Sequence, residues 1–206
     1  MDGVFAVITS KDIPINQKID GSKSIKRDAE NILASKKVLY KGHAVAAVSA
    51  TDRNTAKEAC KLIKVEYEVL EPVKNVDEAI AKNAPIILDD LESDHLGEKV
   101  KNSNIAQHFR HALGNIKDGF DKSDLIVERE FNLQMVHQGY IEPHNATAHW
   151  DENNHLSLWS STQGQFAVRD LTAGFLDLSI SKVTTFPVEI GGGFGGKTKV
   201  YLPPLA

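Results

Sequence analysis

Short apolar runs separated by polar turns make up most of the chain, and they predict strands joined by a few helices. A β-branched run at residues 4–9 predicts a buried strand. Small apolar residues at 44–49 predict a second strand, and alternation of apolar with charged residues at 65–69 predicts a third, half-exposed one. With a helix between the last two, this order indicates a compact α/β module that closes near residue 72.

The segment between the second and third strands has the spacing of an amphipathic helix. Its apolar positions recur at i, i+3, i+4 and i+7, namely Ala56, Ala59, Cys60 and Ile63. Thr51 or Asp52 can cap this helix, and Thr55 with Glu58 has the spacing of a capping box. Cys60 lies on the apolar face, so we expect a small core residue there rather than a reactive thiol.

Two stretches carry little periodicity. Residues 16–37 predict an exposed loop with a short helix at 27–34, and another short helix is expected at 76–81. Residues 83–122 are polar and weakly patterned, which predicts a connector on the surface. Its histidines are expected to be solvated rather than metal-bound: His95, His108 and His111.

Strand patterns return from residue 125. One predicted strand has a shared apolar face made of Val127, Phe131, Leu133 and Met135. Two further runs, 146–150 and 156–160, flank an Asp-Glu-Asn-Asn sequence that is typical of a hairpin turn. A helix is expected at 166–176 and a strand at 183–190.

The last predicted strand leads into the glycine loop, which is the segment Gly191-Gly192-Gly193-Phe194-Gly195-Gly196-Lys197-Thr198. Five glycines in six positions allow the main chain to approach an anion or a polar cofactor closely. The same letters fit a flexible turn, a Walker A loop and a dinucleotide-binding fingerprint. The last two patterns need a helix after the loop, and Pro203-Pro204 follow too soon for one to form.

Composition narrows the function without naming it. The chain has 206 residues, of which 41% are hydrophobic and 25% charged, as in ordinary folded proteins. A net charge of −4 does not suggest a nucleic-acid partner. The single cysteine cannot form an internal disulfide or hold an iron–sulfur cluster, and suits a reducing compartment. No apolar run approaches the roughly 20 residues of a membrane span, and no secretory signal is visible.

Three motifs stand in a fixed order: His137-Gln138-Gly139-Tyr140-Ile141-Glu142-Pro143-His144, then Trp159-Ser160-Ser161-Thr162-Gln163, then the glycine loop. Together with the upstream module and its Val65-Glu66-Tyr67-Glu68 ending, they resemble the molybdopterin-binding large subunit of the molybdenum hydroxylases, the xanthine dehydrogenase and aldehyde oxidase family. The resemblance implies an α+β fold. It places an α/β hammerhead domain at 1–82, a connector at 83–123, and the truncated first part of a cofactor-binding domain at 124–206.

The resemblance also implies site residues. Those expected to bind the molybdenum cofactor are Gln163, Gly192, Gly193, Phe194 and Gly195. Gln163 and Phe194 would lie beside the ligands of the metal, and no residue of this chain would bind the metal directly. An amide side chain and backbone N–H groups are the neutral donors that suit a metal oxo ligand. Glu142 is expected to orient neighbouring backbone rather than to catalyse, and His137 and His144 to bind no metal.

The implied reaction is oxidative hydroxylation with water-derived oxygen. The cofactor would be molybdenum–molybdopterin or its cytosine dinucleotide form, and electrons would pass to [2Fe-2S] and FAD on partner subunits or fused domains. The assembly is expected to be cytoplasmic and dimeric. Purine-oxidising members carry glutamate where this chain has Thr198, so we expect an aldehyde or another N-heterocycle as substrate.

The general-base glutamate of the family matches no residue here and is expected downstream. We therefore interpret the chain as an internal piece of a longer protein, inactive alone. Two alternatives stay open. One is a P-loop NTPase using Gly191–Thr198, and the other is a non-catalytic assembly module built on residues 44–70.

Overall fold

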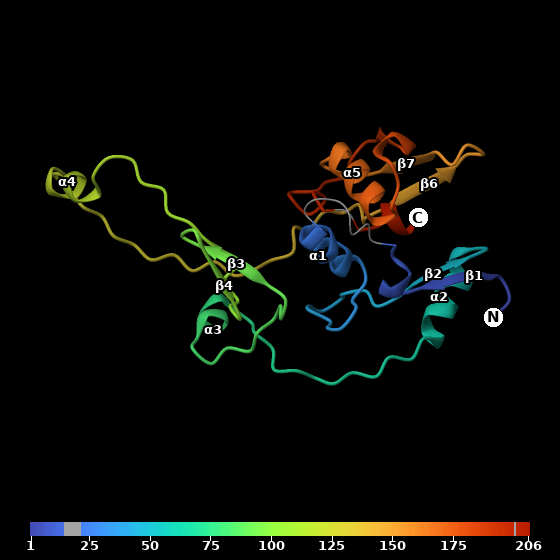
Figure 1. Ribbon diagram of the computed structural model, residues 1–206, viewed down its shortest axis with the longest axis horizontal. Helices are drawn as coiled ribbons and strands as arrows, with labels where there is room; N and C mark the ends of the chain where they lie inside the picture. The colour runs from blue at the N-terminus through green and yellow to red at the C-terminus, as the bar shows by residue number, and fades with distance from the viewer. Residues whose placement is uncertain (15–21, 200) are drawn as a thin grey trace. The chain divides into compact units, whose positions relative to one another are not determined.

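The structure is a computed structural model that describes residues 1–14, 22–199 and 201–206. The chain divides into two compact units, one formed by Met1–Lys64 with Met135–Ala206 and the other by Val65–Gln134. Both units combine helices with small sheets, so the fold is α+β (Figure 1).

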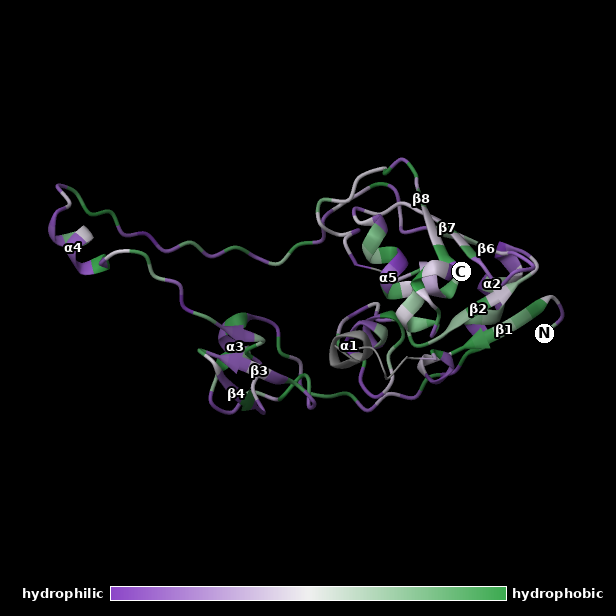
Figure 2. Ribbon diagram, turned by 45° about the horizontal axis from the view of Figure 1, so that its top comes forward, coloured by the Kyte–Doolittle hydropathy of each residue, from purple (hydrophilic) through white to green (hydrophobic). Residues whose placement is uncertain are grey.

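The first unit begins with a two-stranded sheet. β1 (Val4–Ile8) pairs antiparallel with β2 (Ala47–Ala50), and α2 (Arg53–Leu62) follows β2. The strand prediction for 4–9 is confirmed, but its predicted burial is wrong, because Phe5 is 73% exposed and Val7 is 51% exposed. Figure 2 shows β1 as a largely hydrophobic ribbon.

Helix α2 has the expected aspartate cap but not the expected capping box. Asp52 is its N-cap, and the carboxylate accepts hydrogen bonds from the N–H groups of Asn54 and Thr55, so the expected capping box of Thr55 with Glu58 is wrong. The short aspartate reaches the free N–H groups directly. Ala59 is buried as predicted, but Cys60 is exposed, because the buried face of the helix is narrower than its apolar face.

Between β1 and β2 lie η1 (Ser10–Asp12) and α1 (Ser22–Ile32). Helix α1 is longer than the helix predicted at 27–34. Its last turn and the next residue contribute Ala29, Ile32 and Leu33 to the core. The loop expected from residue 16 lies partly outside the described residues.

The rest of the first unit is a three-stranded sheet with a helix against it. β6 (Ala146–Trp150) and β7 (Leu156–Ser160) form the predicted hairpin, and β8 (Val183–Pro187) runs parallel to β7 on its other side. α5 (Gln165–Phe175) connects β7 to β8, and the short helices η2 (Ile180–Lys182) and η3 (Pro203–Leu205) flank this region. No α-helix follows the glycine loop in the described residues.

One apolar core joins the two sequence-distant parts of this unit. Leu156 and Leu158 of β7, Val168 and Phe175 of α5, and the three core residues at the end of α1 and directly after it belong to a single buried cluster. The alternation of β7 explains its share, since residues 156, 158 and 160 are buried while 157 and 159 are partly exposed.

The second unit holds a small sheet that the sequence pattern did not predict. β3 (Glu92–His95) pairs antiparallel with β4 (Glu98–Lys101) and parallel with β5 (Gln107–His108). α3 (Val76–Ile80) confirms the short helix expected there, and α4 (Ile116–Asp121) is a further one. The strands are charged and short, so they lack the apolar alternation that identifies a strand.

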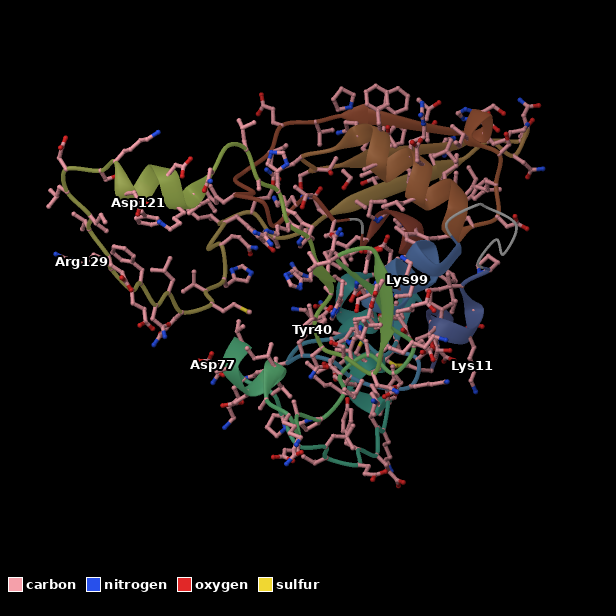
Figure 3. All side chains as sticks on the ribbon, turned by 60° about the vertical axis from the view of Figure 1, so that its left-hand side comes forward. Lys11, Tyr40, Asp77, Lys99, Asp121 and Arg129 are labelled. Carbon is pink, nitrogen blue, oxygen red and sulfur yellow. The ribbon has the colours of Figure 1, made fainter. Side chains whose placement is uncertain are left out.

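Two predicted strands are wrong. Residues 65–69 and 125–135 are extended, but neither pairs with another strand, and their apolar side chains are exposed, as at Val69 and Met135. Figure 3 shows Arg129 on the second of these segments and Asp121 at the end of α4. Within the described part of the chain, no helix has the length and apolar character to cross a bilayer.

Candidate functional site

Three segments meet at one end of the strands of the β6–β7–β8 sheet. Because β7 and β8 are parallel, their carboxyl ends lie on the same side of the sheet, and antiparallel β6 begins there. The segment before β6 contains Glu142, the one after β7 contains Gln163, and the one after β8 is the glycine loop. Sheet topology therefore brings together the three motifs that are distant in sequence.

Gln163 lies against the glycine loop. Its side-chain oxygen Oε1 accepts hydrogen bonds from the N–H groups of Gly195 at 3.0 Å and Lys197 at 3.2 Å. Its own backbone N–H donates to the carbonyl of Lys197 at 3.0 Å, and the hydroxyl of Thr162 donates to the same carbonyl at 3.1 Å. Two donors on Oε1 fix the direction of the amide, so its NH2 group faces away from the loop.

Three of the glycines are required by side chains of this same chain. A Cβ on Gly191 would lie 2.5 Å from Cβ of Glu142, one on Gly193 would lie 2.6 Å from Oε1 of Gln163, and one on Gly196 would lie 2.6 Å from the Tyr140 ring. The sequence predicted a close approach to a ligand. The structure shows that much of the glycine content allows the loop to pack on its own protein.

The remaining part of the loop is open. Gly195 has a φ of 87° and nothing within 4 Å of where a Cβ would be, and Phe194 has a φ of 48° and is 74% exposed. Among the described residues, neither the backbone N–H of Phe194 nor the NH2 group of Gln163 has a hydrogen-bond partner. Two neutral donors on exposed residues, one on the loop and one on Gln163 beside it, are therefore available to a ligand.

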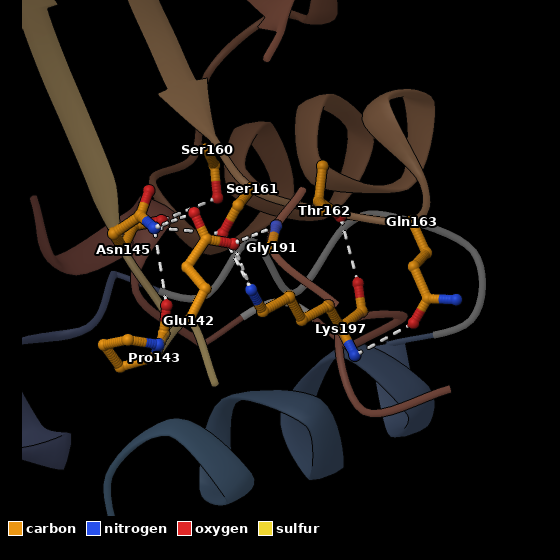
Figure 4. Close-up of polar contacts among 9 residues, drawn as sticks. All are labelled: Glu142, Pro143, Asn145, Ser160, Ser161, Thr162, Gln163, Gly191 and Lys197. Carbon is orange, nitrogen blue, oxygen red and sulfur yellow. Dashed lines mark hydrogen bonds and ion pairs between the residues drawn. The ribbon is translucent and has the colours of Figure 1, made fainter. Parts of the chain in front are cut away.

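An ion pair joins the loop to the segment before β6, with its lysine buried and its glutamate partly exposed (Figure 4). The Lys197 side chain is 0% exposed, and its ammonium contacts the Glu142 carboxylate and, at 3.3 Å, the Ser161 hydroxyl. Glu142 also accepts the N–H of Gly191 at 2.8 Å. The Lys197 ammonium and then the Gly191 N–H lower the pKa of Glu142 to about 2, so its carboxylate is ionised at neutral pH.

The sequence alone did not predict this pair. Glu142 was expected to orient backbone, and it does bind the Gly191 N–H. Lys197 entered the sequence analysis only as part of the glycine loop and of the P-loop alternative, and its partner is 55 residues away. The only signal was that both residues belong to the three recognised motifs.

Aromatic rings continue from the loop toward the end of the chain. Tyr140 contacts His137 and His144, and His144 contacts Tyr201. Burial, and then the charges of Lys197 and His137, lower the pKa of His144. In residues 1–14, 22–199 and 201–206, no group of three histidine, cysteine or acidic side chains converges as a metal site would require.

The geometry does not support the P-loop alternative. A P-loop lysine reaches toward phosphates above an open loop, whereas Lys197 points into the protein and is paired. Thr198 uses its hydroxyl to donate to the Gly195 carbonyl at 2.8 Å.

Two family profiles match the chain. The molybdopterin cofactor-binding domain matches residues 97–206, more than half of the chain, and the a/b hammerhead domain of aldehyde oxidase and xanthine dehydrogenase matches residues 1–71. Both kinds of domain were expected from the three motifs and the upstream module.

Curated relatives and solved structures agree with these matches. A probable hypoxanthine oxidase of Escherichia coli is 31% identical over 98% of this chain and 24% of its own length. The carbon monoxide dehydrogenase large chain of Afipia carboxidovorans is 30% identical over 98% of this chain and 25% of its own. The structure of CO dehydrogenase from Oligotropha carboxidovorans superposes with a TM-score of 0.73 at 26% identity, covering 98% of this chain and 25% of that one. The chain thus spans about a quarter of the length of these relatives.

Proposed function

The chain belongs to the molybdopterin cofactor-binding domain family, and from this premise we propose that it forms part of the cofactor site of a molybdenum hydroxylase. The observation that carries the proposal is the open end of the glycine loop. There, Gly195 has nothing within 4 Å of where a Cβ would be, Phe194 and Gln163 are exposed, and neither the Phe194 N–H nor the Gln163 NH2 group has a hydrogen-bond partner among the described residues.

These residues fit a molybdenum–pterin group. A polar cofactor with oxo ligands needs donors without negative charge, and an amide and main-chain N–H groups are such donors. The cofactor-binding residues proposed are Gln163, Gly192, Gly193, Phe194 and Gly195. Gly193 keeps Gln163 close to the loop, since a side chain there would displace the amide. Gly195 and Phe194 supply the main chain that is open to solvent.

The chemistry that this cofactor supplies is the two-electron oxidation of an electron-poor carbon with oxygen from water. Within this chain, Gln163 orients and binds, and Glu142 is already committed to Gly191 and Lys197. A carboxylate with a pKa of about 2 is a weak base at neutral pH. We therefore place the general base outside these residues, and we expect the 206-residue chain alone to give no turnover.

For the substrate we propose an aldehyde or an N-heterocycle other than xanthine. Thr198 occupies the position at which purine-oxidising members carry glutamate, and a hydroxyl cannot share a proton with a purine ring as a carboxylate can. Its hydroxyl already donates to Gly195. Turnover of the intact protein on a panel of aldehydes, N-heterocycles and xanthine tests this, and xanthine as the best substrate would contradict it.

The remaining components are also proposed. Electrons would leave through [2Fe-2S] clusters and FAD on partner subunits or fused domains, in a dimeric cytoplasmic assembly whose pterin is free or a cytosine dinucleotide. The domain boundaries at residues 82 and 123 likewise stay predictions.

Metal and pterin content test the cofactor site directly. The intact protein should purify with molybdenum, measured by elemental analysis, and with pterin, measured by fluorescence after oxidation. Gln163→Ala and Gly195→Val should lower both by severalfold, while Gly164→Ala, where a Cβ meets nothing closer than 3.6 Å, should retain them. Unchanged molybdenum and pterin in the first two variants would exclude the proposed site.

A further inference from the structure

Lys197 is an unusual residue in the glycine loop. It is among the largest fully buried side chains of the described residues, although its neighbours Gly196 and Thr198 are partly exposed and exposed, respectively. A buried ammonium is costly unless partners surround it. Here the partners are the Glu142 carboxylate, the Ser161 hydroxyl and the face of the Tyr140 ring, whose centroid is 5.2 Å from Nζ.

The pair joins both ends of the loop. A single carboxylate oxygen of Glu142, Oε2, accepts the N–H of Gly191 and the ammonium of Lys197. Gly191 begins the close turn and Lys197 ends it, so this one atom holds the loop closed. Asn145 supports Glu142 on the other side, because its Nδ2 donates to Oε1 at 3.3 Å and to the Ser161 hydroxyl at 3.1 Å.

The backbone of Lys197 connects the pair to Gln163. Its N–H donates to the Gln163 side chain, and its carbonyl accepts the Gln163 backbone N–H. The side chain of Lys197 therefore sets the position of the peptide groups to which Gln163 is bonded. Loss of the ion pair would free those groups before it affected the β-sheet.

We propose that Glu142 and Lys197 form a latch that closes the glycine loop and thereby fixes the direction in which Gln163 presents its NH2 group. Both are positioning residues, since their charged groups contact each other and the loop and do not face the open end. The inference rests on the proposed function only for what the NH2 group binds. The charged and titratable groups around the latch are His144, His137 and Tyr140, and none of them supplies a second carboxylate.

Amide hydrogen exchange of the cofactor-free chain tests the latch. Glu142→Gln keeps the shape of the side chain but removes its charge. Lys197→Met keeps length and removes the ammonium, and the double variant leaves no unpaired charge if either single variant folds poorly. The control is Lys182→Met, which removes a cation that donates to the Asn153 carbonyl elsewhere in the same unit.

We expect exchange at the N–H groups of Gly191, Gly195 and Lys197 to rise at least tenfold in the latch variants. The amides of β7 should stay within twofold of the parent chain, and Lys197→Arg should restore part of the protection. Unchanged exchange at the loop would overturn the latch. An equal rise in β7 would overturn it as well, because the pair would then be a general stabilising contact.

The two proposals fail separately. Exchange is measured without cofactor, so a protein that lacks molybdenum can still show the latch. Conversely, an intact protein with normal molybdenum content and no change of exchange in Glu142→Gln would retain the proposed function and lose the latch.

Discussion

At the scale of single residues, the glycine loop is shaped as much by its own protein as by any ligand. Gly191, Gly193 and Gly196 lie against Glu142, Gln163 and Tyr140, and only the segment around Gly195 is open. Glycine serves two purposes in one loop, allowing close packing beneath it and leaving main chain accessible above it. Substitutions at different glycines should therefore have different consequences.

Gly191→Ala should reduce stability because of a steric clash. Its Cβ would lie 2.5 Å from Cβ of Glu142, an atom that cannot move without its backbone. We expect a loss of about 1–3 kcal/mol in the free energy of unfolding, measured with denaturant. Gly164→Ala is the matched control and should cost less than about 1 kcal/mol. A Gly191→Ala chain as stable as its parent would show that the contact is not this close.

The charge of Glu142 should give the chain a pH-dependent stability. Its pKa is about 2 in the folded chain and about 4.3 when unfolded. A lowered folded pKa contributes stability that is complete above the unfolded value and disappears as the pH falls through the folded value. The difference in Tm between the parent and Glu142→Gln should be constant above about pH 5 and shrink toward zero by about pH 2. A difference that does not vary with pH would contradict the assignment.

At the scale of elements, the sequence predicted those whose signal is local. The β6–β7 hairpin has the predicted boundaries because its turn residues and alternation lie within 15 residues. Helix α5 lies within one residue of its predicted bounds, whereas strand β8 begins at residue 183 as predicted but ends at Pro187 rather than at residue 190. The alternation at 125–135 predicted a strand, and the backbone there is extended but has no partner strand. Strand pairing depends on residues distant in sequence, which the local pattern does not show.

The contacts of the candidate site likewise fall into those that the sequence predicted and those that it did not. The motifs predicted that Gln163 and the glycine loop belong together, and the sheet places them in contact. They could not predict the pairing of Glu142 with Lys197, which depends on the orientation of two side chains in the folded core. Burial of Cys60 was overpredicted for a related reason, since an apolar helix face shows only which residues could be covered.

Substitution of a core residue next to α1 measures how much the packing of residues 1–64 against residues 135–206 stabilises the first unit. Leu33, directly after α1, is 0% exposed and belongs to the same cluster as Leu156 and Phe175. Leu33→Ala should therefore cost about 2–5 kcal/mol in the free energy of unfolding. Leu62 is the last residue of α2 and is 68% exposed. Leu62→Ala should therefore change the free energy of unfolding by no more than about 0.5 kcal/mol. Similar effects of both substitutions would mean that α1 does not pack in this core.

At the scale of the whole molecule, the first unit is built from two stretches of chain with the second unit inserted between them. The connections run through extended segments at 63–74 and 125–140 that have no strand partners. Most of their apolar side chains are exposed, whereas Leu156 and Leu158 of β7 and Val168 and Phe175 of α5 are buried. Stability should consequently vary along the chain, with the connections opening most readily.

Limited digestion with trypsin measures this difference, because cleavage needs several residues of accessible, extended backbone. The first cuts should follow Lys64, Lys74, Lys122 or Arg129. Lys182 is exposed but immediately precedes β8, and Lys197 is buried in the latch, so both should resist until the first unit unfolds. Mass spectrometry of the early fragments identifies the sites. Early cleavage after Lys197 would mean that the glycine loop opens in the folded chain, and the closed arrangement of Glu142, Lys197 and Gln163 would then not be its resting state.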